Sequence, residues 1–523
     1  MSHKPARLVQ EFLEHSARRL PDKVALICDN QRLTYAEIER LANSLAHALI
    51  ASGFQRGDRL AIYLPNSVAA VVGIFAALKA GGAFVIINST TKRDKLVQIL
   101  NNCRAAALIT GGRNQALVND ILGFIPHLHT IVTSGSTAAP QTDAAVPDAR
   151  RVRFLEFEGL AQAYSNEPPD RRNIDLDLAC LIYTSGSTGE PKGVMSDHSN
   201  IVFAASSIIE YLENIEADIL INVLPLSFDY GLYQLLMAFK FGGALVLERS
   251  FAYPAAILGR MQAEGVTGFP GVPTVFSMLL QIDLTAYDLS SLRYLSNTAA
   301  ALPVSHIQKL RQKFPGVTLY SMYGLTETKR TLYLPPKYLD SKPDSVGIPI
   351  PGTEAWVEDE AGRRLPPGQV GELVVRGRHV MRGYWEDPAA SAQRFRPGSL
   401  PGERLCYSGD LFRMDEEGFF YFVGRKDDII KTRGEKVAPK EVENVLYKLE
   451  GIAEAAVIGL PDPILGESIK AFVALADHSL TEQQILAHCR AHLEDFMIPQ
   501  AIEIRPELPK TPSGKIDKKP LIS

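Results

Sequence analysis

The chain has 523 residues, of which 46% are hydrophobic and 22% are charged, and its formal net charge is −4. This length is too great for one ordinary hydrophobic core and predicts at least two domains. The composition is typical of a soluble globular protein, and the charge lacks the basic excess of a nucleic-acid binder.

The sequence shows no export signal and no membrane span. Its polar N-terminus lacks the apolar core of a signal peptide, and no stretch reaches the ~20 apolar residues that cross a bilayer. Without CxxC spacing, the five cysteines favour reduced thiols over disulfides or a zinc site. They are Cys28, Cys103, Cys180, Cys406 and Cys489. We expect a cytoplasmic protein.

Short β-branched runs alternate with amphipathic segments along the first part of the chain. This alternation predicts α/β layers with parallel strands. A segment rich in Thr, Ala, Pro and Ser, Gly135–Pro147, predicts a surface loop. The expected strands are residues 60–65, 83–88, 107–110, 129–134 and 178–183, with a helix at 67–79.

The pattern restarts near Gly424–Asp428, after short strands with turn residues. The segment that follows has its own sequence of elements, which predicts a small α+β domain. We therefore place an N-terminal domain at residues 1–424 and a C-terminal domain at residues 425–523. The elements expected in the latter are helices at 439–449 and 481–493 and strands at 454–459 and 469–475.

The strongest local signal is the loop Tyr183–Gly193, YTSGSTGEPKG. Its glycines let backbone N–H groups converge on an anion, its hydroxyls add donors, and Lys192 adds charge. A flexible Gly/Ser turn would explain part of this run but not the whole. A Walker A loop needs Gly-Lys-Ser/Thr at its end, whereas Lys192 stands between Pro191 and Gly193.

Five further motifs follow this loop in order, namely YGLTET (323–328), GELVVRG (371–377), YSGD (407–410), GRKDDIIK (424–431) and PKTPSGKI (509–516). With them, essentially the whole chain resembles the superfamily of AMP-forming acyl-CoA synthetases, adenylation domains and luciferases. The resemblance implies α/β layers with a β-barrel-like subdomain and a mobile C-terminal lid. It also implies an ATP- and Mg²⁺-dependent ligase that forms an acyl-AMP and then a thioester.

Carboxylate adenylation depends on positioning and on stabilising charge at the phosphoryl oxygens. The resemblance implies that Glu327 is the Mg²⁺ ligand, a hard donor for a hard cation, and that Thr326, Lys515 and Lys431 are catalytic. Lys515 would bridge the carboxylate and the α-phosphate, although a tail lysine is usually a solvated charge. The implied nucleotide-binding residues are Thr184, Ser185, Gly186, Ser187, Thr188, Gly189, Lys192, Ala299, Ala300, Ser321, Met322, Tyr323, Asp410 and Arg425.

The segment around Asp427 resembles the hinge about which the C-terminal domain of such enzymes rotates between their two reactions. Asp427 is then the hinge residue, and Lys431 faces the site in the second step. An ordinary interdomain linker fits the same residues.

Asp229 follows Phe228, where superfamily members that activate amino acids carry an aspartate for the substrate ammonium. An aspartate that caps the following helix is the alternative. Lys329 and Arg330 directly follow the nucleotide motif, where superfamily members line the acyl pocket. Two buried cations need an anion, which indicates a second carboxylate on the substrate, unless one of the two side chains points outward.

Asn297 and Thr298 stand where many superfamily members have a glycine pair, so they are candidates for polar contacts to the acyl group. Asp229 with Lys329 and Arg330 resembles the 3-methylaspartate–acyl carrier protein ligases of vicenistatin-type macrolactam biosynthesis. That resemblance implies transfer of a β-amino acid to the phosphopantetheine of a stand-alone acyl carrier protein in polyketide (antibiotic) assembly.

The alternative closest in chemistry is a CoA ligase for an amino-bearing acid such as an aminobenzoate. A luciferase-like monooxygenase and a non-catalytic binder are more distant alternatives, and Glu327 with Lys515 speaks against the second of these.

Overall fold

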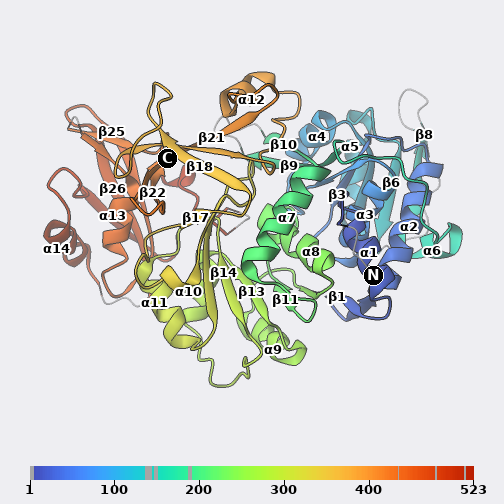
Figure 1. The fold of residues 1–523 in the computed structure, drawn as a ribbon, viewed down its shortest axis with the longest axis horizontal. Coiled ribbons are helices and arrows are strands. Elements are labelled where there is room, and N and C mark those ends of the chain that lie inside the picture. The colour runs from blue at the N-terminus through green and yellow to red at the C-terminus, as the bar shows by residue number, and fades with distance from the viewer. Residues whose placement is uncertain are drawn as a thin grey trace.

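The structure, a computed structural model, describes residues 5–135, 144–145, 151–185, 191–433, 435–476, 480–511 and 514–522. Figure 1 shows two α/β layers built by the first part of the chain, an antiparallel sheet beside them, and the C-terminal domain at the far end. The mixed α/β class, with a large N-terminal domain and a smaller C-terminal one, is as the sequence predicts.

One large sheet runs in the order β10-β9-β4-β3-β5-β6-β8-β7. Its central strands are parallel, whereas β9 and β10 form an antiparallel hairpin at one edge. Its strands are β3 (Arg59–Tyr63), β4 (Ala83–Ile86), β5 (Ala105–Gly111), β6 (Thr130–Ser134), β7 (Ala144–Ala145), β8 (Arg151–Glu156), β9 (Leu178–Ser185) and β10 (Pro191–Asp197).

The second large sheet runs in the order β17-β16-β15-β14-β13-β11-β12-β1-β2. From β15 to β1 the strands are parallel, so their carboxyl ends meet at one edge. Its strands are β1 (Val24–Cys28), β2 (Gln31–Thr34), β11 (Ile219–Asn222), β12 (Ala244–Leu247), β13 (Gly268–Gly271), β14 (Tyr294–Asn297), β15 (Thr318–Tyr323), β16 (Leu332–Leu334) and β17 (Ile348–Pro349).

Helices cover both large sheets and join them into one core. On α3, which is apolar on every side, all residues are buried, and Phe75 stacks on Phe239 of α8 with 5.2 Å between ring centroids. The helices of this domain are α1 (Glu11–Arg19), α2 (Tyr35–Ala51), α3 (Val68–Lys79), α4 (Arg93–Asn102), α5 (Gln115–Ile121), α6 (Leu160–Ala163), α7 (His198–Leu212), α8 (Asp229–Phe241), α9 (Pro254–Glu264), α10 (Pro273–Leu280), α11 (Val304–Lys313) and α12 (Pro388–Arg394).

An antiparallel sheet corresponds to the barrel-like subdomain. It runs β18-β19-β21-β20, with β22 beside β21. Its bounds are β18 (Thr353–Glu358), β19 (Val370–Gly377), β20 (Phe395–Pro397), β21 (Arg404–Met414) and β22 (Phe420–Arg425).

The C-terminal domain packs two helices on a sheet in which β25 and β26 form a long hairpin. Its elements are β23 (Ile430–Thr432), β24 (Glu435–Val437), α13 (Pro439–Leu446), β25 (Ile452–Asp462), β26 (Gly466–Leu475), α14 (Glu482–His492) and β27 (Ala501–Arg505).

Most expected elements are present, with small shifts at their ends. The helix expected at 439–449 ends earlier, at Leu446, and the strand expected at 454–459 extends to Ile452–Asp462, because it pairs along its length with β26. The segment expected as a loop, Gly135–Pro147, lies largely outside the described residues, and its described pair Ala144–Ala145 is strand β7.

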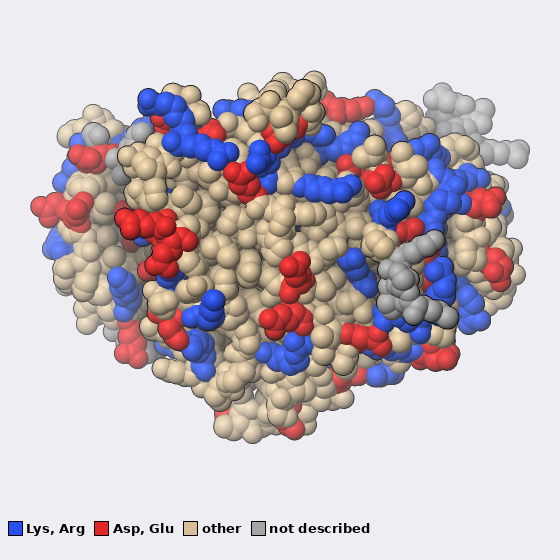
Figure 2. All heavy atoms as spheres, viewed as in Figure 1, with Lys and Arg blue, Asp and Glu red and all other residues tan. Residues whose placement is uncertain are grey.

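Charges of both signs are interspersed over the face in Figure 2. In the ranges described, no helix is both long and apolar enough to cross a membrane.

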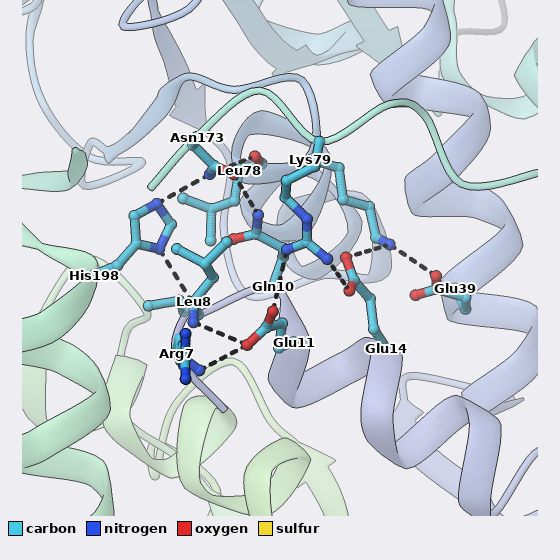
Figure 3. Close-up of polar contacts among 12 residues, drawn as sticks. Arg7, Leu8, Gln10, Glu11, Glu14, Glu39, Leu78, Lys79, Asn173 and His198 are labelled. Carbon is cyan, nitrogen blue, oxygen red and sulfur yellow. Dashed lines mark hydrogen bonds and ion pairs between the residues drawn. The ribbon is translucent and has the colours of Figure 1, made fainter. Parts of the chain in front are cut away.

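The N-terminal helix α1 is held by a buried polar network (Figure 3). Lys79, at the end of α3, is 4% exposed, and its Nζ lies 3.3 Å from Glu14 and 2.7 Å from Glu39. The imidazole of His198 accepts the backbone N–H of Val9 at 3.1 Å, and burial lowers its pKa to about 4. These contacts join α1 to α2, α3 and α7.

Replacing Lys79 with methionine should destabilise the protein by about 3 kcal/mol, because Glu39 loses its cation and Glu14 keeps only Arg171. The thermal unfolding midpoint should therefore fall by several degrees. The control is Arg93→Met, which breaks the exposed pair of Arg93 with Asp120 and should cost at most ~1 kcal/mol. Equal shifts in the two variants would contradict the buried role of Lys79.

Candidate active site

The β9–β10 hairpin carries the two ends of the glycine-rich loop. Thr184 on β9 pairs with Lys192 on β10, and the Nζ of Lys192 lies 3.9 Å from Asp387 Oδ2. Ser185 ends β9. Gly186, Ser187, Thr188 and Gly189 lie outside the described residues.

Strand β15 and the turn after it place Glu327. Ser321 and Met322 are buried on β15, and Thr326 is half-buried in the turn. Glu327 is 8% exposed, and its Oε1 accepts a hydrogen bond from the Tyr384 hydroxyl at 2.5 Å. Arg394 Nε lies 3.9 Å from the same oxygen.

A second carboxylate, Asp410, stands on β21 and is 5% exposed. The Tyr323 hydroxyl donates to its Oδ2 at 2.7 Å, and Arg425 Nε lies 3.5 Å from its Oδ1. Burial raises the pKa of Asp410, and Arg425 opposes this rise. Three residues expected at the nucleotide therefore lie together.

Lys515 comes from the C-terminal domain and nevertheless lies in this site. The hydroxyl of Thr274, at the start of α10, donates to the carbonyl of Gly514 at 2.9 Å. Lys515 Nζ lies 5.8 Å from the centroid of the Phe228 ring. Burial lowers the pKa of Lys515, and the carboxylates of Asp229, Asp410 and Glu327 oppose that effect.

Three residues expected to contact the substrate, Asp229, Lys329 and Arg330, are charged and buried. Asp229 is the first residue of α8, whose N-cap is Phe228, and its Oδ2 lies 3.7 Å from Arg330 Nη1. An acidic residue in this first turn also suits the helix dipole, so the substrate role of Asp229 stays a prediction. Lys329 is 0% and Arg330 2% exposed, so neither side chain points into solvent, and their contact with the substrate stays a prediction.

The guanidinium carbon of Arg330 lies 4.4 Å from the centroid of the Tyr230 ring, which is a cation–π contact. Among the described residues, Lys329 Nζ and Arg330 Nε have no hydrogen-bond partner. Burial lowers the pKa of Lys329, while nearby Cys180, Asp229 and Glu327 oppose that shift.

The segment after β14 carries polar atoms at the same edge. Asn297 and Thr298 are buried, and in the described part of the chain Asn297 Oδ1 and Thr298 Oγ1 lack partners. Asn297 Nδ2 donates to the carbonyl of Ala300. Ala299 has a φ of +78°, a conformation in which most non-glycine residues are strained.

Two expected residues are not brought to the site. Asp427, in the turn between β22 and β23, and Lys431, on β23, are exposed. Their roles as hinge and second-step residue stay predictions. Sequence reasoning missed Tyr384 and Arg394, which contact Glu327, because no motif links them to it.

The donors present suit a Mg²⁺ ion shared with phosphates. Glu327 offers a hard carboxylate, and no cluster of three His, Cys, Asp or Glu that could hold a metal occurs among the described residues. Mg²⁺ typically takes one or two carboxylates and completes its shell with water and phosphate oxygens, so Glu327 fits such an ion.

Comparison with known families accounts for this arrangement. The family model of the AMP-binding enzymes matches residues 13–385, and that of the AMP-binding enzyme C-terminal domain matches residues 441–515. The chain belongs to the AMP-binding enzyme family. It is an AMP-forming carboxylate–thiol ligase that uses ATP with Mg²⁺.

Relatives of this AMP-binding enzyme match it over nearly its whole length. A long-chain-fatty-acid–CoA ligase of Bacillus subtilis is 33% identical, with 99% of this chain and 94% of that protein aligned. A feruloyl-CoA synthase of Amycolatopsis sp is also 33% identical, over 96% of each chain. An anthranilate CoA ligase in complex with anthranoyl-AMP has a TM-score of 0.89 and 28% identity, covering 98% of this chain and 96% of its own.

Replacing Lys515 with alanine should lower acyl-AMP formation by about 100-fold or more, because a charge aimed at the transition state is lost. Thioester formation from preformed acyl-AMP should largely survive. ATP–pyrophosphate exchange measures the first step, and thiol-dependent AMP release from synthetic acyl-AMP measures the second.

The matched control is Lys470→Ala, since Lys470 pairs with Glu503 outside the site and should leave both steps unchanged. Equal losses of both steps in Lys515→Ala would show that the assigned role is wrong.

Proposed function

We propose that this enzyme is a CoA ligase for an acid that carries an amino group close to the activated carboxyl, such as an aminobenzoate. The observation that carries the proposal is the position of Asp229, a buried carboxylate close enough to interact electrostatically with Lys515. The similarity to an anthranilate CoA ligase supports the same substrate class.

The chemistry follows from the group of residues around Lys515. A carboxylate oxygen of the acid attacks the α-phosphorus of ATP, and pyrophosphate leaves. The thiol sulfur then attacks the acyl carbonyl, and AMP leaves with the former carboxylate oxygen. Lys515 holds the attacking carboxylate and the α-phosphate together, and Asp410 with Arg425 holds the ribose. Glu327 would hold Mg²⁺, and Thr326 would contact the α-phosphate. When bound, Mg²⁺ would reduce the negative charge of the phosphates.

Asp229 is suited to accept an N–H from the substrate. In the described chain its one ion pair within 4 Å is with Arg330, at 3.7 Å, and no hydrogen bond joins the two. The carboxylate therefore keeps accepting capacity. A buried carboxylate that accepts from an amino group gains a charge-assisted hydrogen bond.

A fatty acid fits this group of residues poorly. An alkyl chain would offer no acceptor to Lys329 Nζ and Arg330 Nε, which are buried without hydrogen-bond partners in the described chain, and no donor to Asp229. The fatty-acid ligases among the relatives therefore support the type of reaction but not a fatty acid as the substrate.

A second candidate is the transfer of an amino diacid, such as 3-methylaspartate, to a phosphopantetheinylated acyl carrier protein. The observation in its favour is that Lys329 Nζ and Arg330 Nε are buried without partners in the described chain. A second carboxylate would accept from both cations, while Asp229 would meet the amino group.

ATP–pyrophosphate exchange should separate the candidates when it is run with anthranilate, benzoate, aspartate, 3-methylaspartate, β-alanine and palmitate. Exchange with anthranilate above benzoate, and thioester formation with free CoA, is the expected result. Preference for aspartate or 3-methylaspartate, with transfer only to a carrier protein, would establish the second candidate. Exchange with palmitate alone would exclude both.

Asp229→Asn should lower kcat/KM for anthranilate by about 10- to 100-fold, because a hydrogen bond to a charged group contributes about 1.5–3 kcal/mol. Benzoate, which lacks the amino group, serves as the control and should change by less than about threefold. Equal losses for the two acids would place Asp229 outside amino recognition.

Lys329→Met tests the second candidate through the substrate's additional carboxylate. If that candidate holds, activity with aspartate should fall by at least about tenfold more than activity with β-alanine, which lacks the additional carboxylate. Similar losses with both acids would mean that Lys329 does not meet a substrate anion.

A further inference from the structure

Tyr384 belongs to a segment that pairs with the strand carrying Lys192. The backbone N–H of Trp385 donates to the carbonyl of Gly193 at 2.7 Å, and that of Met195 donates to the carbonyl of Gly383 at 2.9 Å. The segment therefore runs along β10 directly after the glycine-rich loop. This pairing fixes the backbone of Tyr384 relative to the β9–β10 hairpin, which carries the two ends of the glycine-rich loop.

The side chain of Tyr384 points to the other half of the site. It is 7% exposed, and its hydroxyl donates to Glu327 Oε1 at 2.5 Å. Arg394 Nε donates to the same hydroxyl at 3.3 Å, and the guanidinium is itself anchored on a main-chain carbonyl of β21 at 2.8 Å. The phenol oxygen thus accepts one hydrogen bond and donates another, which leaves its O–H directed at Glu327.

The ring of Tyr384 has a separate contact. Lys192 Nζ lies 5.5 Å from its centroid, within the range of a cation–π interaction. One side chain therefore touches the loop lysine through its face and the metal-binding carboxylate through its hydroxyl.

The hydrogen bond engages one oxygen of Glu327 and leaves the other without a partner in the described chain. A carboxylate fixed in this way presents its second oxygen in one direction. Hydrogen bonds to ligating carboxylates commonly orient them and affect metal affinity about 10- to 100-fold.

We infer that Tyr384 is a positioning residue for Mg²⁺–ATP, which acts by holding Glu327 in the orientation that meets the metal, with Arg394 holding the phenol. The inference rests on the family's use of ATP with Mg²⁺ and not on which acid is activated. The role of Tyr384 can therefore be refuted while the proposed substrate class stands, and the substrate class can be refuted while the role of Tyr384 stands.

The test is the binding of α,β-methylene-ATP, which cannot be cleaved at the reacting bond, measured by calorimetry with and without Mg²⁺ and with no acid present. In Tyr384→Phe the ring and its contact with Lys192 stay, so metal-free binding should be unchanged. The tightening of binding by Mg²⁺ should fall by about tenfold, and the Mg²⁺ concentration for half-maximal adenylation should rise.

Tyr421→Phe is the matched control, since the Tyr421 hydroxyl donates at 3.0 Å to Asp415, a carboxylate outside the site. It should leave binding with and without Mg²⁺ unchanged. Arg394→Met should reproduce the Mg²⁺-selective loss in weaker form. An unchanged Mg²⁺ effect in Tyr384→Phe, or equal weakening with and without the metal, would overturn the inference.

Discussion

The site depends on compensating buried charge between parts of the chain that are far apart in sequence. Glu327, Asp410 and Asp229 are each less than a tenth exposed, and a carboxylate withdrawn from water is costly unless a cation or a donor meets it. The compensating groups come from several segments. Arg425 lies near Asp410, Arg330 near Asp229, and Tyr384 with Arg394 near Glu327.

Lys515 completes this compensation from the second domain. Its charge interacts with all three carboxylates, while the neighbouring Gly514 is tied to Thr274 of the large domain. The hydrogen bond between Thr274 and Gly514 therefore also holds the loop that carries Lys515 against the large domain. That the C-terminal domain rotates about Asp427 between two reactions stays a prediction.

The parallel sheet explains why these segments meet. Strands β11, β13, β14 and β15 run in the same direction, and ligands of open α/β sheets bind beyond the carboxyl ends of the strands. Asn297 ends β14, Glu327 follows β15, and Thr274 follows β13. The polar residues that the sequence singles out are thus gathered at one edge by the topology.

Much of the fold and the nucleotide part of the site is predictable, because apolar runs and motifs in a fixed order indicate them. Alternating apolar runs indicated the α/β layers, and the motif residues Tyr323, Asp410 and Arg425 lie together as expected. Tyr384 was not predictable, because its bond to Glu327 requires two segments 57 residues apart in sequence to meet. The pairing of Asp229 with Arg330 depends likewise on how α8 approaches the turn after β15.

The thiol acceptor depends on features that no local motif encodes. The sequence favoured a carrier protein through the resemblance of Asp229, Lys329 and Arg330, whereas relatives that match nearly the whole chain include several CoA ligases. The residues proposed to contact the acid do not distinguish the two thiols, because both acceptors present the same phosphopantetheine sulfur.

The most direct test of the account follows the oxygen atoms of the acid. The best substrate is prepared with ¹⁸O in its carboxylate, turned over with ATP and thiol, and the nucleotide product is examined by mass spectrometry. The account predicts that one ¹⁸O appears in AMP, since the carboxylate attacks the α-phosphorus. Label in inorganic phosphate, with ADP as the nucleotide product, would show an acyl-phosphate route and contradict the account.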